Sequence, residues 1–221
     1  MTTEWQKFYE QPVTLRRIFE IVNGQKVFLD KIIHYGRGGG LLETGIGSGI
    51  MSIYLSSLGH RVIGLDKSSA LVERARALSR TLSVLGVSPE FVTGDTTSLP
   101  FESESFAVCF HQGVFEHFDD DRILRALKEQ LRVARFVVFS VPTVRYPCRD
   151  VGDERLLPAS IWRAILRPFR VIDAFGYNFG PSWLVHALQR HVPQPVLRLA
   201  KLDEVERGRE IGFVVERGIT V

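Results

Sequence analysis

Short apolar runs alternate with stretches of helical spacing along most of this chain. The helical stretches place an apolar residue at every third or fourth position, as an amphipathic helix requires. They predict helices over residues 13–33, 48–58, 70–85, 123–133, 161–166 and 183–202. The apolar runs predict strands over residues 41–43, 61–65, 90–93, 106–110, 136–141, 169–175 and 211–216. Near-continuous apolar strands that alternate with helices are typical of an α/β fold, with a parallel sheet covered by helices on both faces.

Composition and charge narrow the class of protein. The 221 residues are 45% hydrophobic and 24% charged, as in an ordinary soluble domain. The net charge of +3 is weak, which argues against nucleic acid as a partner. Two cysteines cannot form a disulfide framework, and no apolar stretch reaches the ~18 residues of a membrane span. We therefore expect a cytoplasmic protein with no membrane span.

The chain shows no internal repeat and no linker-like tract, so we expect one domain over residues 1–221. Residues 1–35 are predicted to form a helical leader and residues 36–221 the α/β core. A helical insertion from about residue 181 to 205 precedes the last strand. Helical spacing alone leaves two uses open for this insertion, a lid over an apolar acceptor and the surface of a homodimer.

The segment ETGIGSG, residues 43–49, follows the first predicted strand and opens a helix. Glycine lets the backbone turn sharply and lets a ligand approach closely, while a helix N-terminus offers free N–H groups. The G-x-G-x-x-G pattern of nicotinamide enzymes is excluded because Ile50 stands where its third glycine would be. No Gly-Lys-Ser/Thr follows to make a phosphate loop. Taken alone, the segment could still be a tight turn without a ligand.

Acidic residues end the next two strands, at the edge where parallel sheets bind their ligands. Asp66 lies about twenty residues after the glycine loop, where an acid can bind ribose hydroxyls. Asp95 ends the third strand and could accept a hydrogen bond from an adenine amino group. Each acid alone could equally be a solvated turn residue, but together with the loop they indicate a nucleoside site.

With these pieces, the sequence resembles the class I S-adenosylmethionine (SAM)-dependent methyltransferases. The matching segments are ETGIGSG (43–49), VIGLD (62–66), GDTTSLPF (94–101), SFAVCFHQGVFEHF (105–118) and IGFVVER (211–217). The resemblance implies a Rossmann-like, seven-stranded sheet in the order 3-2-1-4-5-7-6, with strand seven antiparallel. It also implies SAM as the cofactor and S-adenosylhomocysteine (SAH) as its product. The cofactor-binding residues that it implies are Glu43, Gly45, Gly47 and Gly49 at the methionine end, Asp66 at the ribose, Asp95 and Thr96 at the adenine, and Lys67, Gly94, His111 and Gln112 beside them.

The residues after the fourth strand are candidates for chemistry. Histidine titrates near neutral pH, so His111 is our candidate for a general base, with packing over the cofactor as the alternative. The pair Glu116–His117 resembles acid–histidine pairs that bind a divalent metal in some family members, together with an upstream acid. Gly113 stands where that acid would be. We therefore expect no metal and a structural role for His117.

Candidate substrate contacts lie in two loops. Loops at this edge of a sheet usually carry specificity, and residues 142–158 are rich in arginine, acids and aromatics. Tyr146, Arg149 and Arg155 are the candidates there, although a solvated loop pinned by an Arg–Asp pair would show the same composition. In the family that this sequence resembles, the N-terminal leader often folds over the cofactor. Tyr9, in the leader, is therefore a further candidate substrate contact.

The sequence thus predicts a SAM-dependent methyltransferase that acts on a small-molecule acceptor by in-line displacement. The sequence HQGV at residues 111–114 replaces the Asn/Asp-Pro-Pro-aromatic motif of many nucleic-acid-modifying members, which disfavours methylation of base amino groups. Two alternatives stay open: a macromolecular acceptor, either RNA or protein, and a non-catalytic SAM-binding scaffold. The acceptor atom is not encoded in any motif.

Overall fold

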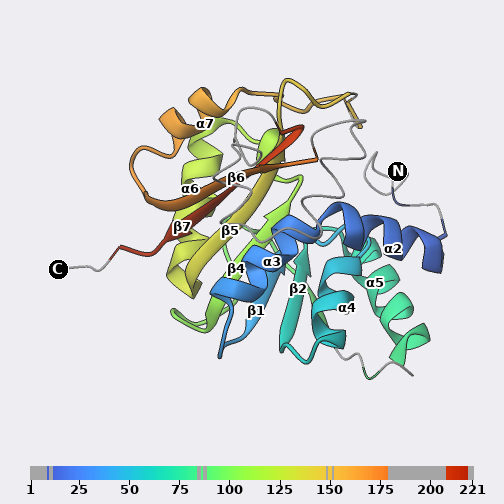
Figure 1. The fold of residues 1–221 in the computed structure, drawn as a ribbon. Helices are drawn as coiled ribbons and strands as arrows, with labels where there is room; N and C mark the ends of the chain where they lie inside the picture. Colours follow the sequence, from blue (N-terminus) through green and yellow to red (C-terminus); the bar gives the residue numbers. More distant parts are fainter. Residues whose placement is uncertain are drawn as a thin grey trace.

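The computed structural model describes residues 9, 12–83, 86, 89–147, 149–150, 152–178 and 208–218. Its centre is a seven-stranded sheet in the order β3-β2-β1-β4-β5-β7-β6 (Figure 1). The strands are β1 (Leu41–Thr44), β2 (Val62–Asp66), β3 (Glu90–Thr93), β4 (Phe106–Gln112), β5 (Ala134–Pro142), β6 (Arg170–Tyr177) and β7 (Glu210–Glu216). Strands β1 to β5 pair in parallel, whereas β7 pairs antiparallel with both β5 and β6. The predicted sheet order and the antiparallel seventh strand are confirmed.

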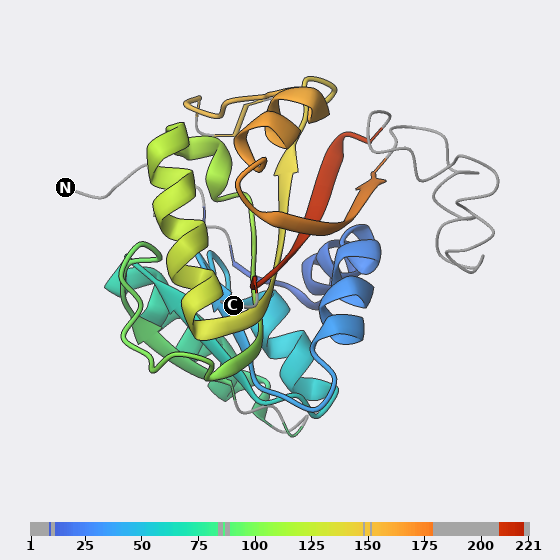
Figure 2. The ribbon, with the colours of Figure 1, turned by 90° about the vertical axis from the view of Figure 1, so that its left-hand side faces the viewer.

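Helices cover both faces of this sheet. They are α2 (Leu15–Gly24), α3 (Lys26–Tyr35), α4 (Ile50–Ser57), α5 (Ser69–Thr81), α6 (Asp120–Val133) and α7 (Ala159–Ile165), with a short 3-10 turn, η2 (Phe115–His117). Alternate residues of a strand point to opposite faces. Leu41 accordingly packs in the core beside α3 and α4, while Leu42 packs in the core beside α6 and α7. In Figure 2 the sheet stands between α6 and α3.

The helix predicted over residues 13–33 is two helices in the structure. α2 ends at Gly24 and α3 begins at Lys26, so Gln25 lies at the junction. The Gln25 side chain is buried, accepts a hydrogen bond from the Tyr177 hydroxyl at 2.8 Å and donates one to Glu210 at 3.3 Å. At the break between the two helices, the Gln25 amide points toward the sheet and contacts β6 and β7.

The helical insertion expected at about residues 181–205 lies outside the described residues, as does most of the leader before Pro12. Among the described helices, none is long and apolar enough to cross a membrane. Tyr9 is described, and it lies over the carboxyl edge of the sheet against the glycine loop.

Candidate active site

The glycine loop leaves the end of β1 with three glycines in the left-handed backbone region. The φ angles are +74° at Gly45, +52° at Gly47 and +74° at Gly49, values that L side chains rarely adopt. Space for a side chain is also missing. A Cβ on Gly47 would lie 2.5 Å from the Tyr9 ring, and one on Gly49 would lie 2.8 Å from the Ala75 methyl group. The turn and the close approach of Tyr9 therefore both depend on glycine.

A cleft of about 430 Å³ opens beside this loop. Six of the residues expected to bind the cofactor or the substrate line it: Tyr9, Gly45, Gly47, Asp66, Lys67 and Gln112. The cleft lies where the carboxyl ends of β1, β2 and β4 meet, which is the ligand edge of a parallel sheet. The structure thus brings together residues from four separate segments of the chain.

Asp66, the last residue of β2, is held in a fixed orientation at the cleft wall. Its Oδ1 accepts a hydrogen bond from the Ser68 backbone N–H at 2.8 Å, and its Oδ2 accepts one from Gly47 N–H at 3.4 Å. Burial raises the pKa of Asp66, and these backbone donors oppose the rise. The carboxylate therefore joins the glycine loop to the start of α5 and faces the cleft without needing to reorganise.

The end of β3 is placed differently from our expectation. Gly94, Asp95 and Thr96 do not line the cleft. Asp95 accepts hydrogen bonds from the backbone and hydroxyl of Thr97, which lower its pKa, and it lies 3.5 Å from the ammonium group of Lys67. The Thr96 side chain is buried and accepts a hydrogen bond from Gln130 at 2.8 Å. Asp95 therefore borders the cleft through Lys67, whereas the Thr96 hydroxyl is turned into the core.

His111 requires a correction. Its side chain is completely buried, lies 4.1 Å from the Phe115 ring centroid and stacks 5.5 Å from that of Phe139. Neither ring nitrogen has a hydrogen-bond partner of ordinary geometry among the described residues. Burial lowers the pKa of His111 to about 3, although the nearby Gln130 amide opposes this shift. The ring lines neither the cleft nor the cavities beside it, so this placement argues against the expected role as general base.

Glu43 is also buried, but it lies at the site. Its Oε2 accepts hydrogen bonds from the backbone N–H and the hydroxyl of Ser52, while its Oε1 has no partner among the described residues. Burial raises the pKa of Glu43 to about 8. Glu43 lines a second cavity, of about 330 Å³, which adjoins the cleft at Tyr9, Gly45 and Gln112.

The candidate substrate residues divide into two groups. Tyr146 lines this second cavity, and so does Tyr9. Arg149, in contrast, is exposed and donates to the Gly152 carbonyl at 3.3 Å. The Arg155 guanidinium donates to the Phe118 carbonyl at 2.6 Å and pairs with Asp120 at 2.7 Å. Neither arginine lines a described cavity, and Arg155 forms the Arg–Asp pair that was the alternative reading of this loop.

A smaller pocket of about 60 Å³ lies deeper, between the ends of β4 and β5 and the start of β7. Four acidic residues line it: Glu116, Asp150, Glu154 and Glu210. Burial, together with the smaller effect of the neighbouring acids, raises the pKa of Glu116 to about 8. Burial also raises the pKa of Glu210, against hydrogen bonds from Tyr177 and Gln25. We call this the carboxyl pocket.

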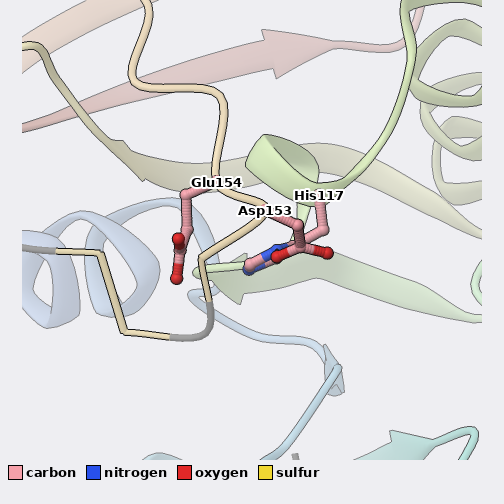
Figure 3. Close-up of side chains that lie close together, drawn as sticks. All are labelled: His117, Asp153 and Glu154. Atoms are coloured by element: carbon pink, nitrogen blue, oxygen red, sulfur yellow. The ribbon is translucent and has the colours of Figure 1, made fainter. Parts of the chain in front are cut away.

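His117 forms a cluster with Asp153 and Glu154 (Figure 3), and two of the three, His117 and Glu154, also line this pocket. One ligand atom from each lies within 4.8 Å of the others, a grouping that could hold a metal ion. Nδ1 of His117 lies 2.6 Å from Asp153, and Oε2 of Glu154 accepts from the Gly152 N–H at 2.9 Å. The imidazole and both acids thus already have protein partners.

Several cleft residues were not singled out from the sequence. They are Ser68, Ser69 and Leu71 in the turn into α5, and Val114 and Phe118 around η2. The Asp-Lys-Ser-Ser run after β2 was a usable signal, because serine is a preferred N-cap and Ser68 caps α5. Glu210 had no local signal, since it lies at the start of a strand far along the chain.

The sheet order, the glycine cradle and the oriented acid of β2 define a Rossmann-like α/β protein with a site for a nucleoside-containing cofactor. Residues 42–136 match the family model of a methyltransferase domain. The matched segment, from β1 to the start of β5, is therefore similar to a methyltransferase domain, a family that uses SAM. No curated protein matches the chain.

Solved structures share this fold at low sequence identity. A chain in the complex between the Haloferax volcanii Trm112 methyltransferase activator and a methyltransferase is 15% identical, with a TM-score of 0.67 over 99% of both chains. The PH0226 protein of Pyrococcus horikoshii OT3 is 15% identical, with a TM-score of 0.65 over 92% of both. Magnesium protoporphyrin IX methyltransferase from Synechocystis PCC 6803, with bound SAH, is 16% identical, with a TM-score of 0.63 over 97% of this chain and 93% of that one.

Proposed function

We propose that this protein transfers the methyl group of SAM to a small-molecule acceptor. The observation that carries the proposal is the cradle at the end of β1, where no Cβ fits on Gly45 or Gly47 and where the oriented Asp66 carboxylate faces the same cleft. A backbone without side chains accommodates close ligand approach, and an oriented carboxylate accepts hydrogen bonds from ribose hydroxyls.

In this proposal Gly45 and Gly47 pass beneath the methionine end of the cofactor, Asp66 holds the ribose, and Tyr9 covers the loop. When bound, SAM supplies a methyl group already activated on a sulfonium. The protein's task is then to hold the acceptor atom close to that methyl group in a dry pocket. The second cavity, lined by Glu43 and Tyr146 and joined to the cleft at Gln112, is where we place the acceptor.

The first experiment is calorimetric titration of the protein with SAH, with NAD as the control ligand. We expect micromolar binding of SAH and none of NAD. Binding of neither ligand would overturn the proposal. Binding of SAH would be followed by assays of SAH formation with small-molecule acceptors and with RNA, because product formed only with RNA would contradict the small-molecule assignment.

A further inference from the structure

We propose that the acceptor is an amine, whose cationic end enters the carboxyl pocket formed by Glu116, Asp150, Glu154 and Glu210. This inference rests on the proposed function, because the pocket is an acceptor site only if the adjoining cleft holds SAM. It is argued from the buried acids, from the size of the pocket, and from its position beside the cleft.

Glu116 has a buried carboxyl oxygen without a hydrogen-bond partner in the described part of the chain. Its side chain is only 3% exposed and lines the carboxyl pocket. Its Oε2 has no hydrogen-bond partner among the described residues. The nearest basic group to its other oxygen is Nε2 of His117, at 4.0 Å, which is too long for a hydrogen bond. An unpartnered buried carboxyl oxygen costs free energy, and a donor on a ligand would remove that cost.

The groups around Glu116 make the carboxyl pocket acidic. The titratable groups that face it are Asp150 and Glu154 from the loop after β5, Glu210 from β7, Tyr146, and His117 beside it on η2. Within the described residues, no lysine or arginine lines the carboxyl pocket. The charges of these acids repel that of Glu116 and add to the rise of its pKa. A cation from outside is the ligand that this arrangement favours over a neutral or anionic one.

The carboxyl pocket has the size and the position to hold the amino end of a larger molecule. About 60 Å³ holds an ammonium group with one or two carbons and excludes a whole substrate. The pocket shares Tyr146, Asp150 and Glu210 with the larger acceptor cavity, and it shares Gln112 and His117 with the cofactor cleft. The body of an amine can therefore lie in the larger cavity while its nitrogen stays next to the cleft. The Tyr146 ring adds an aromatic face, which also attracts cations.

A metal ion is the competing cation. Its ligands would be His117, Asp153 and Glu154, but two of these already pair with each other and the third accepts from a backbone N–H. Glu116, the pocket acid with the lowest exposure and an Oε2 that is unpartnered among the described residues, lies outside that cluster. An ammonium group would satisfy this oxygen directly, because it brings several N–H donors into the pocket.

Methyl transfer to an amine needs no reactant besides SAM and the amine itself. A protonated amine first passes one proton to a pocket carboxylate, which leaves a free electron pair on nitrogen. Transfer then forms one N–C bond and breaks one S–C bond, so that the positive charge passes from sulfur to nitrogen. Glu116 is placed to take the proton, because it lines the pocket and its buried Oε2 has no other hydrogen-bond partner among the described residues.

The test uses matched ligand pairs in the full-length protein saturated with SAH: benzylamine with benzyl alcohol, and n-hexylamine with 1-hexanol. Calorimetry at pH 7 measures the affinity for each ligand. We expect each amine to bind about tenfold or more tightly than its alcohol, as a charge-assisted hydrogen bond predicts.

Glu116→Gln keeps the shape of the side chain but replaces one carboxyl oxygen with an NH₂ donor, so it should reduce the amine preference by about fivefold or more. Glu210→Gln, a second variant, should also reduce the preference. Glu90→Gln, an exposed change at the start of β3, should leave the preference unchanged. Equal affinity within each pair, binding of neither member, or amine binding that requires added Zn²⁺ or Mg²⁺ would overturn the proposal. Failure of SAH itself to bind would instead overturn the proposed function.

Discussion

The orientation of Asp66 makes a quantitative prediction about cofactor binding. Replacing it with asparagine keeps the size of the side chain and one acceptor oxygen for the Ser68 N–H, now 2.8 Å away. The second oxygen becomes an NH₂ group, which cannot accept from a ribose hydroxyl and which meets the Gly47 N–H, 3.4 Å from Oδ2, with another donor. We expect Asp66→Asn to weaken SAH binding by about 1–3 kcal/mol, or about 5- to 150-fold in Kd.

The assay is calorimetric titration of wild type and variant with SAH and with its 2′,3′-dideoxyribose analogue. If Asp66 holds the ribose, the loss seen with SAH should largely disappear with the analogue, because the partner hydroxyls are gone. Asp30→Asn, on the exposed face of α3 where Asp30 pairs with Lys26, is the matched control and should bind SAH normally. An equal loss for both ligands would show that Asp66 only supports the loop. Unchanged affinity for SAH would refute the assignment altogether.

Three further predictions concern the stability of the fold and are checked by urea unfolding. Gly49→Ala should lower the free energy of unfolding by about 2–4 kcal/mol, because it adds left-handed strain and a contact at 2.8 Å; Gly38→Ala, with φ +79° and no atom within 4 Å, should lose less, and equal losses would contradict the contact argument. Glu43 keeps its proton to about pH 8 when folded but releases it near its ordinary value of 4.5 when unfolded, so stability should fall as pH rises between these values, by up to about 1.4 kcal/mol per pH unit; Glu43→Gln should flatten that slope, and an unaltered slope would contradict the raised pKa. Lys31→Met should cost about 1–3 kcal/mol, because it leaves the mostly buried Asp173 carboxylate, 2.6 Å from Nζ, without its ammonium partner; a loss below about 0.5 kcal/mol would mean that the pair is already solvated.

The strands could be predicted to within a few residues because a buried parallel strand leaves a continuous apolar run. The helix boundary at Gln25 could not, since that break depends on Tyr177 and Glu210, which lie far along the chain. No local pattern records such a long-range polar contact. Residue propensity and hydrophobic spacing therefore predicted the strands of the sheet, but they missed the break between the two N-terminal helices.

At the site, the glycine loop and Asp66 could be predicted because they follow strands whose carboxyl ends must meet. His111 was misassigned because it was judged by its chemistry and by its place near the end of a strand. Residues two apart in a strand share a face, and His111 shares its face with the completely buried Cys109. Gln112, one residue further on, points to the other face and reaches the cleft. Phe110, on the face of Gln112, is equally buried, so the alternation within β4 alone could not tell the two residues apart.

The antiparallel direction of β7 places its first residue beside the cleft, so mutations there bear on the proposed acceptor site. Because β7 runs against its neighbours, its first residue, Glu210, lies at the edge where the parallel strands end. One wall of the proposed acceptor region is thus encoded more than 160 positions after the glycine loop, which lies at 43–49, and outside the 42–136 segment that matches the family model. If the proposal holds, we expect substitutions at the start of β7 to alter which acceptor is methylated without touching the residues proposed to hold the methyl donor. The same strand lies between β5 and β6, so removing it would divide the sheet as well as open the pocket.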